Sequence, residues 1–179
     1  MTYIKQAKQI AIDAHSSVNQ KYDGYLPYQF HLEMVARNVR RYYKKDDIHI
    51  IESAAWLHDV LEDTHLSYND LYKSFSGLSG DDSMQVCEIV FAVTNNKGRN
   101  RAERANDAYY EGIRNTYGAV FVKLCDRLAN VEYGVMTDSS MLKMHKKEWS
   151  HFYKSLGEPT GEIVDKLKNI LEDNSQREV

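Results

Sequence analysis

The sequence predicts an all-α fold, a single-domain helical bundle, and three observations support this prediction. Only two of the 179 residues are proline and nine are glycine, so few positions interrupt helices. Apolar residues recur at intervals of three and four along most of the chain, which is typical of amphipathic helices. The hydrophobic fraction of 42% and the charged fraction of 27% are those of a globular domain. We therefore expect one domain over residues 1–179, without internal repeats or linkers.

Capping and turn residues divide the first half of the chain. Thr2 is a suitable N-cap for the first helix, because its hydroxyl can accept a hydrogen bond from a free backbone N–H. Gly24 and Pro27 are turn residues, so residues 20–28 are expected to form a loop, which is unusually rich in tyrosine. The helices expected in this half cover residues 2–19, 30–43, 48–61 and 67–71.

Glycines and a polar loop divide the second half in the same way. Gly118 separates two helices, and Gly157 with Pro159 separates the last two, which we expect to pack as residues 139–172 on the rest of the bundle. The helices expected in this half cover residues 84–93, 101–116, 119–133, 139–156 and 158–172. Between the first two lies a polar, basic loop. Such loops are usually only solvated, but this one could bind phosphates through Lys97, Arg99 and Arg101.

Bulk properties limit the classes of function. The formal net charge of −3 gives no reason to expect binding to nucleic acid. Cys87 and Cys125 lie in apolar helical patterns, so we expect buried thiols in a reducing compartment, with a disulfide or a cysteine metal site as the alternatives. No signal-peptide core and no apolar run of about 18 residues occurs, so we expect a cytoplasmic protein that does not associate with membranes.

Residues 54–64, with the sequence AAWLHDVLEDT, combine a His-Asp pair with two further acids one helical turn later. On one continuous helix, a face of about 140° would carry all the ionisable side chains: His58, Asp59, Glu62 and Asp63. A solvated polar stripe is the alternative interpretation. The neighbouring residues are strongly apolar, however, and an ionised carboxylate among them is costly unless it is paired or bound to a metal. The stretch therefore predicts half of a metal site.

Two distant residues could complete that site. His31 lies in the second expected helix, and Asp126 lies in a very apolar helix where a carboxylate demands a partner. Such a mixed set of nitrogen and oxygen ligands suits Mn²⁺, Mg²⁺, Fe²⁺ or Zn²⁺. Four other histidines lie on predominantly polar stretches and are expected at the surface or behind the ligands: His49, His65, His145 and His151.

With these residues in order, the chain resembles the HD-domain metal-dependent phosphohydrolases, whose ligand pattern is H…HD…D. It is more similar to the hydrolase domain of the RelA/SpoT group, and its length suggests the small stand-alone form, the metazoan SpoT homologue type. The matching pieces span residues 14–130 in the family's order: Ala14-His15, Gly24, Pro27-Tyr28, His31, Val35-Ala36, 54–64, Val93-Thr94 and 122–130.

The resemblance implies a helical bundle of the HD-domain phosphohydrolase type around one divalent metal, most commonly Mn²⁺. The metal ligands that it implies are His31, His58, Asp59 and Asp126. Glu62 and Asp63 match the family's catalytic acidic pair, which orients and deprotonates the water held at the metal. The implied reaction removes pyrophosphate from the 3′ position of guanosine tetra- or pentaphosphate, (p)ppGpp, and leaves GDP or GTP.

Substrate recognition is where the chain departs from the family. Asn130 matches a residue at the nucleoside side of the pocket, and the basic residues of the 95–101 segment match only as a basic loop. The family's Arg-Lys pair after the first helix is Gln20-Lys21 here, so only Lys21 carries over as a substrate-binding residue. Because glutamine cannot stack and form the forked hydrogen bonds of a guanidinium, selectivity for guanine stays open.

Three functions therefore remain to be compared. The first is a pyrophosphohydrolase acting on (p)ppGpp, and the second keeps the metal site but acts on another nucleotide or a phosphorylated dinucleotide cofactor. The third is a module that binds a nucleotide without hydrolysing it. The Glu62-Asp63 pair favours the two enzymes, because a module that only binds needs no general base.

Overall fold

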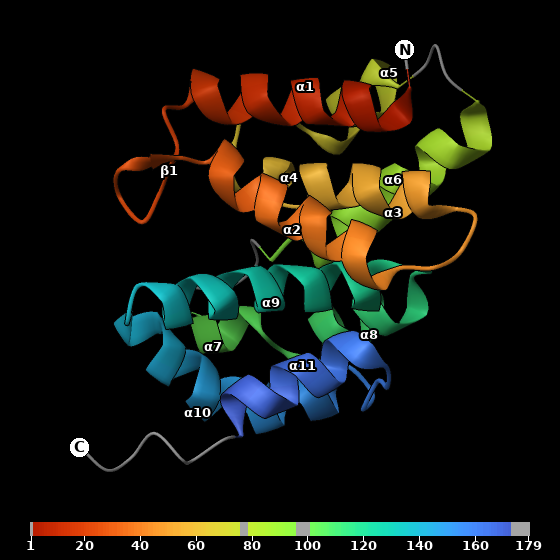
Figure 1. Cartoon of the computed structure of the whole chain (residues 1–179). Helices are drawn as coiled ribbons and strands as arrows, with labels where there is room; N and C mark the ends of the chain where they lie inside the picture. The colour runs from red at the N-terminus through yellow and green to blue at the C-terminus, as the bar shows by residue number, and fades with distance from the viewer. Residues whose placement is uncertain (1, 76–78, 96–100, 173–179) are drawn as a thin grey trace.

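The computed structural model describes residues 2–75, 79–95 and 101–172, with the side chains of residues 101 and 102 excepted. Helices make up nearly all of its regular structure, and the only strands in the described ranges form one small hairpin (Figure 1). The predicted all-α fold is confirmed. None of the helices in these ranges is long and apolar enough to cross a membrane.

Helix α3 is the centre of the N-terminal half. It covers Ile48–Leu57, and every residue of it from position 50 to 57 is buried. Three helices pack around it, which are α1 (Tyr3–Ser17), α2 (Gln29–Tyr42) and α6 (Gly80–Val93). The largely apolar composition of α3 matches this position, because a helix that is hydrophobic over most of its surface is stable only when it is enclosed.

Helix α9 (Ala119–Met136) joins this half to the C-terminal helices. It contacts α2, α3 and α6 on one side, and α8 (Asp107–Asn115), α10 (Ser140–Ser155) and α11 (Glu162–Leu171) on the other. Figure 1 shows α9 lying between the red to yellow N-terminal helices and the blue C-terminal ones. The described residues also form three short helices, which are α4 (Val60–Asp63), α5 (Tyr68–Ser74) and α7 (Arg101–Arg104).

Several predicted elements match the structure at their capping residues. The Thr2 hydroxyl accepts a hydrogen bond from the Lys5 N–H at 3.4 Å, so the predicted N-cap of α1 is confirmed. The short helix predicted after residue 66 begins at a capping box, in which Ser67 and Asp70 each accept from the other's backbone N–H.

Four predicted helix boundaries were wrong, and one of them is the start of α6, which lies at Gly80 rather than at residue 84. The helix expected over 48–61 ends at Leu57 and resumes as α4, because Asp59 has φ −103° and ψ −2°, which interrupts the α-helical course. The helix expected over 101–116 is split between α7 and α8, since the Asn106 side chain caps α8 by accepting from the Tyr109 N–H at 2.9 Å. The last helix begins at Glu162 rather than at residue 158.

The predicted loop over residues 20–28 is a β-hairpin. Strands β1 (Lys21–Tyr22) and β2 (Leu26–Pro27) pair antiparallel. Asp23 and Gly24, between them, have positive φ values of 51° and 78°, as in the tight turns that suit the twist of a hairpin. The Asp-Gly pair was therefore a hairpin signal, which the assignment to a loop passed over.

Substitution of Gly118 by alanine is expected to destabilise the fold. Gly118 precedes α9 with φ +78°, and a Cβ atom there would lie 2.4 Å from the buried Ile51 Cδ1. The left-handed backbone alone should cost about 1–2 kcal/mol in the free energy of unfolding, and Ile51 must also shift. Urea unfolding followed by circular dichroism measures this loss.

The matched control is Gly112→Ala within α8, where a Cβ atom meets nothing within 4 Å. That change should be neutral or stabilising by up to about 1 kcal/mol, because alanine is the better helix former. Equal effects of the two substitutions would contradict the conformational role of Gly118.

Candidate metal centre and active site

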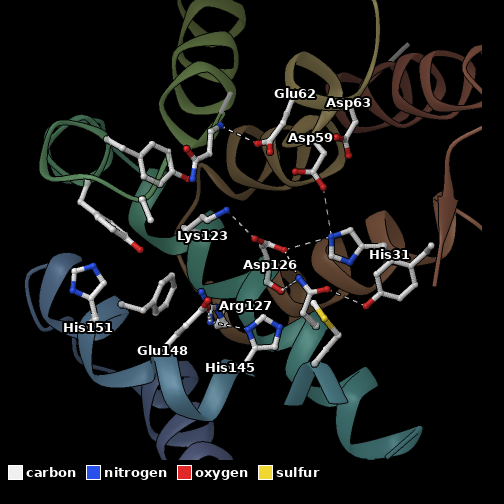
Figure 2. Close-up of a pocket in the computed structure, with 18 of the residues that line it drawn as sticks. His31, Asp59, Glu62, Asp63, Lys123, Asp126, Arg127, His145, Glu148 and His151 are labelled. Carbon is white, nitrogen blue, oxygen red and sulfur yellow. Dashed lines mark hydrogen bonds and ion pairs between the residues drawn. The ribbon is translucent and has the colours of Figure 1, made fainter. Parts of the chain in front are cut away.

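A cavity of about 550 Å³ is bounded by α2, the α3–α4 junction, α9 and α10. His31, Asp126 and the acids of the α3–α4 segment line one wall of it, and Arg127 with residues of α10 lines the opposite wall (Figure 2). Figure 2 shows that the four acids of the first wall come from two segments far apart in the sequence. Asp59, Glu62 and Asp63 come from the α3–α4 junction and α4, and Asp126 comes from α9.

The four ligands predicted from the sequence lie together at this wall. His31 Nε2 and His58 Nε2 are 3.3 Å apart. Asp59 Oδ2 lies 2.9 Å from His58 Nε2 and 3.7 Å from His31 Nε2, and Asp126 Oδ1 lies 3.4 Å from His31 Nε2. One donor atom from each of His31, His58 and Asp126 falls within 4.8 Å of the others. Two imidazoles and the Asp126 carboxylate thus converge, and the Asp59 carboxylate adjoins both imidazoles.

The chemistry of this donor set fits a divalent cation. His58 Nδ1 lies 2.9 Å from the Ala55 carbonyl oxygen, so Nδ1 carries the hydrogen that is donated there. In a neutral His58, the lone pair of Nε2 then faces the carboxylate of Asp59. These two electron-rich groups repel each other unless a cation lies between them. The pKa of His58 also indicates that the site attracts positive charge. Burial disfavours the protonated imidazole, but the carboxylates of Asp59 and Asp126 outweigh burial and raise this pKa to about 9. A metal ion would satisfy all four donors at once.

The convergence occurs at the break between α3 and α4. The helix is interrupted after Leu57, and the adjacent side chains of His58 and Asp59 both lie near His31.

Asp126 has the partners that its apolar surroundings demand. Lys123 Nζ donates to Oδ2 at 3.0 Å, and Asn130 Nδ2 donates to Oδ1 at 2.7 Å. Burial would raise the pKa of Asp126, but Lys123 and the two histidines hold it well below its usual range. Asp126 is therefore an anion that presents Oδ1 to the histidines and Oδ2 to the lysine.

The predicted catalytic pair, Glu62 and Asp63, lines the same cavity. Glu62 Oε2 accepts a hydrogen bond from the Asn95 N–H at 2.9 Å, and Asp63 Oδ2 accepts one from Gln20 Nε2 at 3.3 Å. Burial raises the pKa of Glu62, and burial with the nearby charge of Asp59 raises the pKa of Asp63. Carboxylates with raised pKa values in a cavity are suited to accept a proton.

The residues predicted to bind substrate are not all at the cavity. Asn130 lines it, but its amide is used within the protein, because Oδ1 accepts from the Tyr22 hydroxyl at 3.0 Å and Nδ2 donates to Asp126. Lys21 is exposed and lines a separate hollow of about 140 Å³. The reason is that side chains alternate along a strand, so Tyr22 faces the cavity and Lys21 does not. Lys97 and Arg99 lie outside the described residues, as does the side chain of Arg101.

Several residues of the site were not identified from the sequence. Tyr22 stacks on the ring of His31 with centroids 4.9 Å apart. Tyr28 donates to Asp59 Oδ2 at 2.5 Å, and its ring stacks on the buried His15. The abundance of tyrosine in residues 20–28, noted in the sequence, was the signal that could have placed these rings at the site.

The opposite wall holds a buried polar group. Arg127 Nη1 lies 2.8 Å from His145 Nδ1 and donates to Glu148 Oε2 at 3.3 Å, and the guanidinium lies over the ring of Phe152. His145 was expected at the surface or behind the ligands, and it is buried against Arg127. The apparent polarity of its helix came from residues on the exposed face.

Comparisons with known proteins give a consistent result. No protein-family model matches the chain. The guanosine-3′,5′-bis(diphosphate) 3′-pyrophosphohydrolase MESH1 of Drosophila melanogaster is 37% identical over 78 residues, which are 44% of this chain and 40% of that protein. The Danio rerio protein of the same name is 31% identical over 121 residues, which are 68% of this chain and 63% of that protein. The chain thus covers less than two thirds of the length of these curated relatives.

A solved structure, described as a metazoan ortholog of SpoT that hydrolyzes ppGpp and plays a role in starvation responses, has a similar fold. The TM-score is 0.62 and the sequence identity is 25%, and the match covers 95% of this chain and 88% of that chain. The likeness in fold therefore extends over nearly the whole of both chains.

Proposed function

Because the chain belongs to the small, metazoan SpoT-like HD hydrolases, we propose that it is a metal-dependent pyrophosphohydrolase acting on (p)ppGpp. The reaction would release the 3′-pyrophosphate and leave GDP or GTP. The observation that carries this proposal is the donor set of two histidines and two aspartates beside the Glu62-Asp63 pair in one cavity. The cavity volume of about 550 Å³ is in the usual range for small-molecule sites.

We propose Mn²⁺ as the metal. The four ligands would be His31, His58, Asp59 and Asp126, a nitrogen and oxygen set that excludes a soft thiolate site. When bound, the cation would lower the pKa of a water and offset the negative charge of the phosphoryl oxygens. The interactions of His58 with Ala55, and of Asp126 with Asn130, would keep these ligands oriented.

Glu62 is the proposed general base. Its carboxylate is held by the Asn95 N–H on one oxygen, which leaves the other to accept a proton from the attacking water. Asp63 would orient that water, while Gln20 fixes the Asp63 carboxylate. Gln20 stands where the family usually has arginine, so in this chain the position contacts an acid of the site through a neutral amide.

The direct test is an assay of the purified protein loaded with Mn²⁺ and supplied with ppGpp. Stoichiometric release of pyrophosphate and GDP is expected, with a turnover number of about 1–1,000 s⁻¹. Removing the metal with EDTA should stop the release, and adding Mn²⁺ back should restore it. A sample shown to contain metal that releases no pyrophosphate from ppGpp would overturn the proposal. Parallel assays with GTP, ATP and NADPH test the selectivity for guanine that Gln20 leaves open.

A further inference from the structure

Lys123 is a half-buried cation of the cavity to which the proposed mechanism assigns no contact with substrate. We infer that Lys123 binds an oxygen of the substrate's pyrophosphate group. The inference rests on the proposed function in taking a pyrophosphate as the ligand. It names a residue that touches the reacting group, where the sequence suggested only the basic side chains near residues 97–101.

The position of Lys123 places its charge beside the metal ligands. It lies one turn before Asp126 on α9, on the same face of that helix. Its ammonium contacts Asp126 Oδ2 at 3.0 Å, whereas the histidine nitrogens lie nearest to Oδ1. Figure 2 shows Lys123 reaching into the cavity beside Asp126. The ammonium therefore sits next to the metal centre, on the side of Asp126 away from His31.

The balance of charge in the cavity requires such a cation. Five carboxylates line the cavity: those of Asp59, Glu62, Asp63 and Asp126 lie at the metal centre, and that of Glu148 lies on the opposite wall. The lysine and arginine side chains among the described lining residues are Lys123 and Arg127. Arg127 is engaged by His145 and Glu148 on the opposite wall. An anionic pyrophosphate that binds beside the metal ligands needs positive charge near its oxygens, and Lys123 is the side chain positioned to supply that charge.

The hydrogen-bonding capacity of Lys123 allows this contact. An ammonium has three N–H donors. Asp126 accepts one, and the hydroxyl of Tyr109, which itself donates to the Val93 carbonyl at 2.8 Å, also interacts with Lys123. The side chain keeps 19% of its surface exposed, and it lines the cavity. A third donor can therefore reach an oxygen of an anion in the cavity.

A substrate contact and a purely structural role predict opposite changes in metal affinity. If Lys123 only held Asp126 in place, its removal would free that carboxylate and weaken the binding of Mn²⁺. If Lys123 serves the substrate, its removal takes a positive charge away from a metal ligand. The affinity for Mn²⁺ should then stay the same or rise, and the affinity for pyrophosphate should fall.

The experiment compares the wild type with Lys123→Met and Lys123→Arg. Isothermal titration calorimetry measures the affinity for Mn²⁺, and then the affinity of the Mn²⁺-loaded protein for inorganic pyrophosphate. In Lys123→Met we expect pyrophosphate binding to weaken about 10- to 100-fold, as for the loss of a charge-assisted hydrogen bond, with no loss of Mn²⁺ affinity. Lys123→Arg keeps the charge and should recover most of the affinity for pyrophosphate.

The matched control is Lys8→Met. Lys8 pairs with Glu33 at 3.2 Å outside the cavity, so its loss removes the same charge without touching the site. Both affinities should equal those of the wild type. Circular dichroism verifies folding, and Lys123→Gln replaces the methionine variant if the latter does not fold.

The inference is wrong if Lys123→Met binds pyrophosphate as tightly as the wild type, if its Mn²⁺ affinity falls, or if the wild type binds no pyrophosphate. These outcomes are distinct from failure of the proposed function. A wild type that cannot hydrolyse ppGpp, yet binds pyrophosphate through Lys123, would overturn the choice of substrate alone.

Discussion

Replacing Asp126 by alanine should abolish both metal binding and turnover. Asp126 Oδ1 lies 3.4 Å and 3.8 Å from the Nε2 atoms of His31 and His58, and Oδ2 pairs with Lys123. Its loss removes one donor and leaves the lysine charge beside the remaining ligands. We expect Mn²⁺ affinity to fall by at least about 100-fold and turnover of ppGpp by at least about 1,000-fold. Metal analysis after dialysis and a steady-state assay measure the two effects.

Glu132→Ala is the matched control for this substitution. Glu132 is an acid of the same helix, and it pairs with Arg37 at 3.8 Å outside the cavity. Exposed ion pairs contribute at most about 1 kcal/mol to stability, so metal content and turnover should stay close to those of the wild type. An Asp126→Ala protein that kept its metal and a tenth of its activity would show that Asp126 is not a ligand.

The substitution Glu62→Gln should separate chemistry from binding. Glutamine keeps the shape of the side chain, and its carbonyl oxygen can still accept from the Asn95 N–H, but it cannot take up a proton. We expect kcat to fall about 100- to 10,000-fold, while the affinity for Mn²⁺ and the KM for ppGpp change little. Steady-state kinetics at saturating Mn²⁺ measure this change.

The pH dependence gives a second readout for Glu62. Burial raises its pKa, and a general base acts only when deprotonated, so the rate of the wild type should decline as the pH falls through that raised value. The glutamine variant should lack this decline. Glu111→Gln, an exposed position on α8, should leave both kcat and the profile unchanged. A Glu62→Gln enzyme within tenfold of the wild type would assign the base to another residue.

The fold class could be predicted because helical periodicity and the scarcity of proline and glycine are properties of short stretches. The breaks within the predicted helices could not be predicted from the sequence. Residues 57–60 and 104–107 have no proline or glycine, and the chain departs from the helix there because tertiary packing at the first break and the Asn106 cap at the second outweigh small differences in propensity. The Asp-Gly turn at residue 23 is a different case, since its local signal was present.

For the candidate site, the sequence predicted which residues take part more fully than it predicted where their side chains point. His31, the His58-Asp59 pair and Asp126 stood out because polar groups in apolar surroundings require partners. The direction of Lys21 could not be read, since it depends on how a two-residue strand pairs. The contact of Lys123 with Asp126 follows from helical spacing, but its exposure to the cavity does not.

The sequence by itself determined the all-α class, the family resemblance and the chemical character of the site, because composition, periodicity and motif order are carried along the chain. Only the tertiary structure decided that the helix breaks at His58 and Asp59, that Asn130 is engaged by Tyr22 and Asp126, and that Lys123 faces the cavity. These features depend on contacts between residues as many as 108 positions apart, as for Tyr22 and Asn130. The energy of such contacts exceeds local conformational preference, so the packed fold sets the final direction of each side chain.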